Sequence, residues 1–312
     1  MPLFDAAFTG AAGIEGRFGP LGADAELGAR RIRTECRAAA GVSGDARRTS
    51  RYKAIVCVTR GGRPGLCPSN ADAFLKPFGP PVLQVSSEEG GFLEESARQG
   101  APVHLVARVE RKPVQAVNVT ARLAGADGSL PPLVVMTPRS GWWTCASERG
   151  GGIACWLELM RELKTGSLAR DVVFVASSGH ELGHLGLTHS WTGVPESSAR
   201  SAGWMHFGAN IGAAQDPGNT VQASDDLFEK MLTDAMTAAG LAVARRVPRG
   251  TVPGGEAEVV HRGGGRYVSV IGRNALFHNP ADRGPEAIDP KVISSFADVF
   301  VRVARSIASR TL

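Results

Sequence analysis

The segment 170–190, RDVVFVASSGHELGHLGLTHS, constrains the fold and chemistry of this chain more than any other. Its opening run, DVVFVA, is rich in β-branched and aromatic residues, which is typical of a short strand buried on both faces. Small residues end the run, and His180, Glu181, His184 and His189 follow closely. Open α/β sheets place their sites at the carboxyl ends of such strands. We therefore predict a metal or catalytic site directly after this strand.

Two interpretations of the segment are open. HELGH is a literal H-E-x-x-H motif, in which a helix presents two histidines to zinc and the glutamate acts as base. In that interpretation His180 and His184 are the ligands, with His189 as a further candidate, and Glu181 is the base. However, the motif follows the strand directly and contains Gly183 and Gly186, each of which costs a helix about 1 kcal/mol. The second interpretation is a strand and a tight turn that present Glu181 as a metal ligand.

The composition is that of a globular protein with many turns. Of the 312 residues, 43% are hydrophobic and 21% are charged, and this length accommodates one large α/β domain and a small one. The net charge of +5 comes from scattered arginines, so no nucleic-acid partner is expected. No stretch approaches the roughly 20 apolar residues of a membrane span, so no membrane partner is expected. The N-terminus lacks the pattern of a signal peptide.

From these features we expect a cytoplasmic protein as the sequence is written, or an exported one if the N-terminus is incomplete. The oligomeric state stays open.

The order of patterns along the chain suggests two regions. Over 52–111 a strand, a Gly-rich turn, a Pro-led strand, a helix and a strand follow one another, an order that resembles a protease-associated domain, the small β-rich insert of several exopeptidase families. We expect residues 1–51 and 112–312 to form the main domain, with 1–20 as an irregular arm. Strand and helix patterns alternate after residue 117, which implies an α/β fold with a mostly parallel central sheet flanked by helices.

A colinear series of motifs follows residue 117. It consists of NVTA, TPRSGWW, SERGGGIA, HELGHLG, HFGANIG and FHNPADR. In order and spacing this series resembles that of the di-zinc aminopeptidases, a superfamily that also contains the glutaminyl cyclases. The resemblance covers about two thirds of the chain. It implies a zinc exopeptidase-like fold and hydrolysis of a peptide or small amide substrate.

The resemblance implies three metal ligands. The second glutamate of the family's E-E pair falls on Glu181, the histidine of its last loop on His278, and its bridging aspartate on Glu148. Two carboxylates and one histidine are sufficient for a single catalytic zinc, which needs three protein ligands and a water. The same positions serve the lone zinc of glutaminyl cyclases. The implied cofactor is therefore one zinc ion.

Other family positions have changed. The general base falls on His180, whose reference pKa of about 6.5 suits proton transfer at neutral pH, and which could equally serve as a fourth ligand. The first histidine ligand falls on Pro138, and an aspartate ligand falls on Ala209 or, with a slip, on Asn210. None of these three supplies an imidazole or a carboxylate. A mechanism with two metal ions is therefore not expected.

Further residues fall where the family keeps its metal site. Arg139, Ser140 and Arg149 are candidate substrate-binding residues, since arginine suits a carboxylate or another anion; a structural salt bridge is the alternative. Trp142 and Trp143 are expected either to form the wall of an apolar pocket or to pack.

Three hypotheses follow from the sequence. The first is a single-zinc hydrolase of aminopeptidase or glutaminyl cyclase type, with His180 receiving the proton. The second is a binding or structural protein on the same fold that has lost catalysis. The third is an H-E-x-x-H zinc peptidase.

Overall fold

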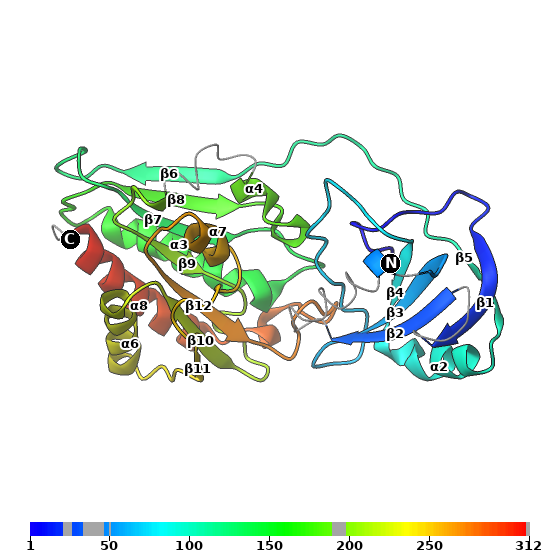
Figure 1. Cartoon of the computed structure of the whole chain (residues 1–312). Helices are drawn as coiled ribbons and strands as arrows, with labels where there is room; N and C mark the ends of the chain where they lie inside the picture. The colour runs from blue at the N-terminus through cyan, green and yellow to red at the C-terminus, as the bar shows by residue number, and fades with distance from the viewer. Residues whose placement is uncertain (21–26, 34–46, 50, 189–197, 310–312) are drawn as a thin grey trace. The chain divides into compact units, whose positions relative to one another are not determined.

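The computed structural model of the protein describes all residues except 21–26, 34–46, 50, 189–197 and 310–312 (Figure 1). His189, one of the four metal-competent residues singled out above, lies outside the described residues. The chain forms two compact units. The first comprises Met1–Gln115 with Glu181–Gly183 and Leu276–Ala281, and the second comprises the remainder.

The first unit is built on a five-stranded sheet of order β4-β3-β2-β1-β5. Its first four strands pair in parallel, and β5 pairs antiparallel to β1. The strands are β1 (Ile14–Pro20), β2 (Leu27–Arg33), β3 (Ala54–Arg60), β4 (Val82–Val85) and β5 (Pro102–Leu105), with the helix α2 (Gly90–Arg98) between the last two.

The start of the chain differs from the expectation. The arm expected to be irregular, 1–20, contains β1, because Ile14–Arg17 pair with Pro102–Leu105 across the sheet. Because β1 and β2 pair within the five-stranded sheet, the described part of 1–51 belongs to the first unit. We expected this region in the main domain. Pairing with strands distant in the sequence defines these elements, and their glycine-rich sequences carry little periodic signal. The protease-associated character of 52–111 stays a prediction.

The second unit contains a seven-stranded sheet of order β11-β10-β12-β9-β7-β8-β6. Four of its pairs are parallel, and β6/β8 and β10/β12 are antiparallel. This confirms the predicted mostly parallel sheet. The strands are β6 (Val119–Leu123), β7 (Leu133–Pro138), β8 (Val172–Ser177), β9 (Gly203–Phe207), β10 (Gly218–Ala223), β11 (Arg245–Arg246) and β12 (Tyr267–Arg273).

Helices cover both faces of this sheet. α3 (Ala146–Leu163), α6 (Asp226–Ala238) and α8 (Pro290–Ala308) pack on one face, in a core that includes the stacked rings of Phe207 and Phe300. On the other face α4 (Leu185–Thr188) and α7 (Ala257–Arg262) contribute to a smaller core (Figure 1). Among the described helices, none combines the length and the hydropathy needed to cross a bilayer.

Asp225 fixes the start of α6. Its Oδ1 accepts a hydrogen bond from the Phe228 N–H at 3.1 Å, and Arg266 Nε lies 3.0 Å from its Oδ2. We expect Asp225→Ala to lower the free energy of unfolding by about 1–2 kcal/mol, for the loss of an N-cap and a half-exposed ion pair. The control, Asp234→Ala, removes only an exposed pair with Lys230 and should cost about 0.3–0.5 kcal/mol. Equal losses in urea unfolding would contradict this role of Asp225.

Candidate functional site

The candidate site follows β8, the strand after which the sequence predicts a metal or catalytic site. The strands β7, β8, β9 and β12 run parallel, so their carboxyl ends lie along one edge of the sheet. After β8 comes the short 3-10 helix η2 (His180–Leu182), and then Gly183 and His184 have φ values of 85° and 57°. Left-handed backbone interrupts an α-helix. Over the described residues 180–188, therefore, the continuous helix required by the H-E-x-x-H interpretation does not form.

Asn118, the asparagine of NVTA, holds this turn in place. Its side-chain Oδ1 accepts from the Ser178 N–H at 3.0 Å, and its Nδ2 donates to the Gly186 carbonyl at 2.7 Å. One amide group thus joins both ends of the segment that carries the two histidines. This gives the NVTA motif a structural role next to the site.

The turn brings His180 and His184 together beside Glu256, which immediately precedes α7. One potential ligand atom from each of the three lies within 4.8 Å of the other two, and this is the only such set of three His, Cys, Asp or Glu side chains among the described residues. The two imidazole rings are 4.9 Å apart between centroids. His180 Nδ1 lies 2.8 Å from Glu256 Oε1. Two imidazoles and a carboxylate are donors that zinc accepts.

A series of hydrogen-bonded, buried polar side chains, Gln222, Ser269 and His206, leads to Glu256 and is called the ladder below. In the sheet register, Ser269 of β12 lies beside His206 of β9 and beside Gln222 of β10. Gln222 Nε2 donates to Ser269 Oγ at 2.9 Å, and Ser269 Oγ lies 2.8 Å from His206 Nδ1. His206 Nε2 then reaches Glu256 Oε2 at 3.1 Å. The glutamate is thus held in place by three adjacent strands.

Gly255 permits this close approach. Its φ is +64°, and a Cβ there would lie 2.7 Å from the His206 ring. A side chain at this position would therefore displace the ring that holds Glu256.

Glu256 is 1% exposed. Burial by itself raises the pKa of a carboxyl group, but the interactions with His180, His206 and His184 outweigh burial and hold the pKa of Glu256 well below its usual range. The group is therefore an anionic carboxylate at neutral pH.

Glu148, a predicted ligand, lies in the first turn of α3 and is buried. Its Oε1 is 2.8 Å from Arg149 Nη2, and Arg149 Nε donates to the Ser140 carbonyl at 2.6 Å. The charge of Glu148 is thus already balanced by a cation of the chain itself. Arg149 thus forms the salt bridge that was the alternative to substrate binding, and the ligand role of Glu148 stays a prediction.

Glu181 and His278, the other two predicted ligands, belong to the first unit. Both contact the loop 68–71: Glu181 O accepts from the Ala71 N–H at 2.7 Å, and His278 Nδ1 donates to the Pro68 carbonyl at 2.7 Å. His278 is buried, and this hydrogen bond leaves Nε2 as the lone-pair nitrogen of the neutral ring, as in many metal-binding histidines. A metal site formed by Glu148, Glu181 and His278 stays a prediction.

The remaining predicted residues lie around the same edge of the sheet. Ser140 accepts from the His180 N–H at 3.1 Å through its side chain. Arg139 is exposed and donates to the Val117 carbonyl at 2.7 Å. Trp142 is half-buried and Trp143 is 45% exposed. Their roles toward a substrate stay predictions.

Two changed family positions have structural roles. Pro138 ends β7. Asn210 Nδ2 donates to the Gly272 carbonyl at 3.1 Å, and Asn210 Oδ1 accepts from Asn274 Nδ2 at 3.2 Å.

Asp282, four residues after His278, also has a structural role. Its Oδ1 accepts a hydrogen bond from the Ser147 N–H at 2.8 Å, at the start of α3.

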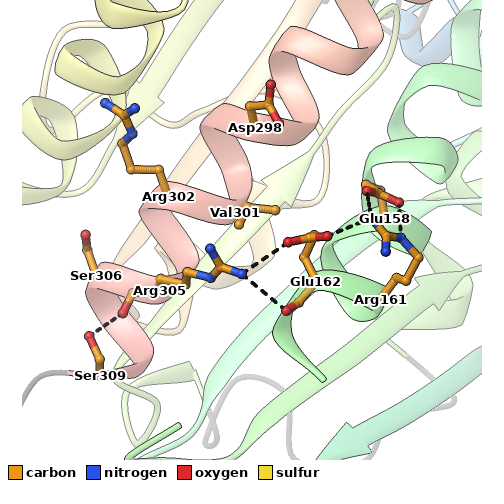
Figure 2. Close-up of a pocket in the computed structure, with 9 residues that line it drawn as sticks. All are labelled: Glu158, Arg161, Glu162, Asp298, Val301, Arg302, Arg305, Ser306 and Ser309. Carbon is orange, nitrogen blue, oxygen red and sulfur yellow. Dashed lines mark hydrogen bonds and ion pairs between the residues drawn. The ribbon is translucent and has the colours of Figure 1, made fainter. Parts of the chain in front are cut away.

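A hollow of about 760 Å³ lies between α3 and α8, away from these residues (Figure 2). Charged side chains dominate its lining, and several neutralise one another. Arg161 pairs with Glu158 at 2.6 Å, and Arg305 of α8 reaches Glu162 of α3 at 3.1 Å. We interpret the contact between Arg305 and Glu162 as a link between the two helices.

Sequence reasoning missed Glu256 and His206. Glu256 lies in a glycine-rich loop, PGGEAE, without a recognisable motif. His206 carried one signal, since a histidine inside the apolar strand GWMHF needs a buried partner. That partner is far away in the sequence.

At the level of sequence, no protein-family model and no curated protein matches the chain. Its structure is similar to that of a zinc aminopeptidase from Bacillus subtilis, at 14% identity and a TM-score of 0.65, over 98% of this chain and 78% of that one. A peptidase M28 precursor from Shewanella amazonensis gives 16% identity and a TM-score of 0.73, over 100% and 78%.

An aminopeptidase from Aneurinibacillus sp. strain AM-1 gives 15% identity and a TM-score of 0.69, over 97% of this chain and 76% of that one. The chain therefore has the fold of these peptidases. The predicted fold is confirmed, and the predicted resemblance is confirmed at the level of fold.

Proposed function

We propose that the protein is a metal-dependent hydrolase that cleaves a peptide or small amide bond, with one zinc ion per chain. The observation that carries the proposal is the cluster of His180, His184 and Glu256 after β8. It places metal-competent donors at the sheet edge where this fold class builds its sites.

The residues of the cluster have complementary roles. The carboxylate of Glu256 can only accept, so His180 must donate its Nδ1–H to it. In the neutral ring, Nε2 of His180 is then the lone-pair nitrogen, and it can accept a proton. Zinc would polarise the substrate carbonyl and lower the pKa of a water molecule. The predicted base role of His180, and the predicted substrate roles of Arg139, Ser140 and Trp142, belong to this proposal.

The test is a substrate panel with metal control. Purified protein is assayed with fluorogenic aminoacyl amides and with peptides that begin with glutamine, the second set serving the glutaminyl cyclase alternative. We expect hydrolysis or cyclisation that 1,10-phenanthroline abolishes, that its non-chelating 1,7 isomer leaves intact, and that zinc restores. Activity that resists chelation would contradict the proposal.

One observation favours the second hypothesis, a binding protein on the same fold. The buried pair of Glu148 and Arg149 occupies positions that the resemblance assigns to the metal site. A zinc-loaded protein that is inactive on the whole panel would support this alternative.

A further inference from the structure

We infer that His180, His184 and Glu256 bind one divalent transition-metal ion, each histidine through a ring nitrogen and Glu256 through a carboxylate oxygen. This set differs from the one that the resemblance implies, Glu148, Glu181 and His278. The inference rests on the proposed function for what the metal would do, but its test measures metal binding and not hydrolysis.

The geometry of the turn supports the site. In a regular helix, two histidines at i and i+4 share one face. Here the chain reaches a similar result without a helix, because the left-handed residues Gly183 and His184 fold the backbone so that the His184 N–H approaches the His180 carbonyl at 3.3 Å. Since zinc–ligand bonds are about 2.0–2.2 Å long, ligand atoms that already lie within 4.8 Å need only small rotations to share an ion.

The hydrogen bonds of the ladder hold Glu256 in one orientation. Gln222 is oriented by the Gly254 N–H, which its Oε1 accepts at 2.6 Å, so its Nε2 is the donor to Ser269. Ser269 then donates to His206 Nδ1, and His206 donates from Nε2 to Glu256. The ladder therefore fixes the position and the orientation of the Glu256 carboxylate.

The carboxylate of Glu256 is surrounded by histidine side chains. Among the described residues, its hydrogen bonds come from His180 and His206, and neither lysine nor arginine contributes. A buried carboxylate is costly unless a cation or several donors accompany it. It also has lone pairs beyond the two used by the histidines. A divalent ion between Glu256 and the histidines would take the place of the proton that His180 Nδ1 donates to Glu256, which is released, and would use these lone pairs.

The experiment measures metal binding in the whole chain. Protein stripped with a chelator is titrated with Zn²⁺ by calorimetry and with Co²⁺ by visible absorption. We expect about one ion per chain and the intense Co²⁺ bands of a four-coordinate site with three protein ligands. His184→Asn keeps a residue that tolerates positive φ, and Glu256→Gln keeps the shape. Each should weaken binding by at least about 100-fold, since loss of even an outer partner costs 10–100-fold.

The matched control is His261→Ala, which removes a histidine of α7 outside the cluster and should bind as the unaltered protein does. Circular dichroism and thermal melting of the stripped variants confirm that they are folded. The inference is overturned if no ion binds, or if His184→Asn and Glu256→Gln bind normally while Glu181→Gln and His278→Ala do not. If the protein binds the metal as expected but has no hydrolytic activity, the proposed function is wrong and the inferred metal site is retained.

Discussion

Replacing His180 with alanine should reduce kcat/KM toward the best substrate of the panel by at least about 100-fold. Proton transfer by a positioned side chain contributes about 10²–10⁴-fold to a rate, and loss of a zinc ligand is no less damaging. His180 is the residue at which the proposed reaction and the inferred metal site meet. The initial rates of wild type and variant, at substrate concentrations well below KM, measure the effect.

The readout of metal content separates the two roles of His180. If it is a ligand, His180→Ala also loses the ion, whereas a base alone would leave the ion bound. His261→Ala serves again as the histidine control and should retain activity. Wild-type activity in a folded His180→Ala protein would remove this residue from the mechanism.

The position of His180 was predictable because strand and site are adjacent in the sequence. The run DVVFVA predicts a buried strand, β8 forms over Val172–Ser177, and the next polar residues must lie at its carboxyl end. The same local logic explains why the turn was favoured over the H-E-x-x-H helix. Glycines directly after a strand end it more readily than they begin a helix.

The support of Glu256 was not predictable in this way. His206, Ser269 and Gln222 lie on three different strands, and only the register of β9, β12 and β10 brings them to one level. The sequence of a single strand does not determine which strands lie next to it in the sheet. Periodicity could place His206 on the face opposite Met205 and Phe207, but not beside a glutamate 50 residues later.

Glu148 shows a different limit. The motif series placed a carboxylate at the expected position on α3, and the structure has it buried there. The sequence left a structural salt bridge of Arg149 open as an alternative, but it did not identify Glu148, the preceding residue, as the partner. The side chain's role therefore depends on its partner and not on its position in the motif.

Arg149→Met should lower the free energy of unfolding by about 3–5 kcal/mol, the cost of leaving one member of a buried ion pair without its partner. The side chains of Arg149 and Glu148 are 4% and 0% exposed, so water cannot easily take the place of the guanidinium. Chemical denaturation of the metal-stripped protein measures the loss.

The double variant Glu148→Leu/Arg149→Met is the informative comparison. It removes both charges and fills the space with apolar groups, a change that is often nearly neutral or stabilising for buried pairs. It also loses the hydrogen bond to the Ser140 carbonyl, worth about 1 kcal/mol. We therefore expect the double variant to recover most of the stability lost by Arg149→Met.

Zinc then distinguishes the two accounts of Glu148. If Arg149 is the cation that replaces a metal beside Glu148, the double variant should bind zinc as the wild type does, because the inferred ligands are His180, His184 and Glu256. If Glu148 is itself a ligand, as the resemblance implies, the double variant should lose the ion. If the folded double variant does not bind zinc, the result would contradict the inferred site and favour Glu148, Glu181 and His278 as the ligands.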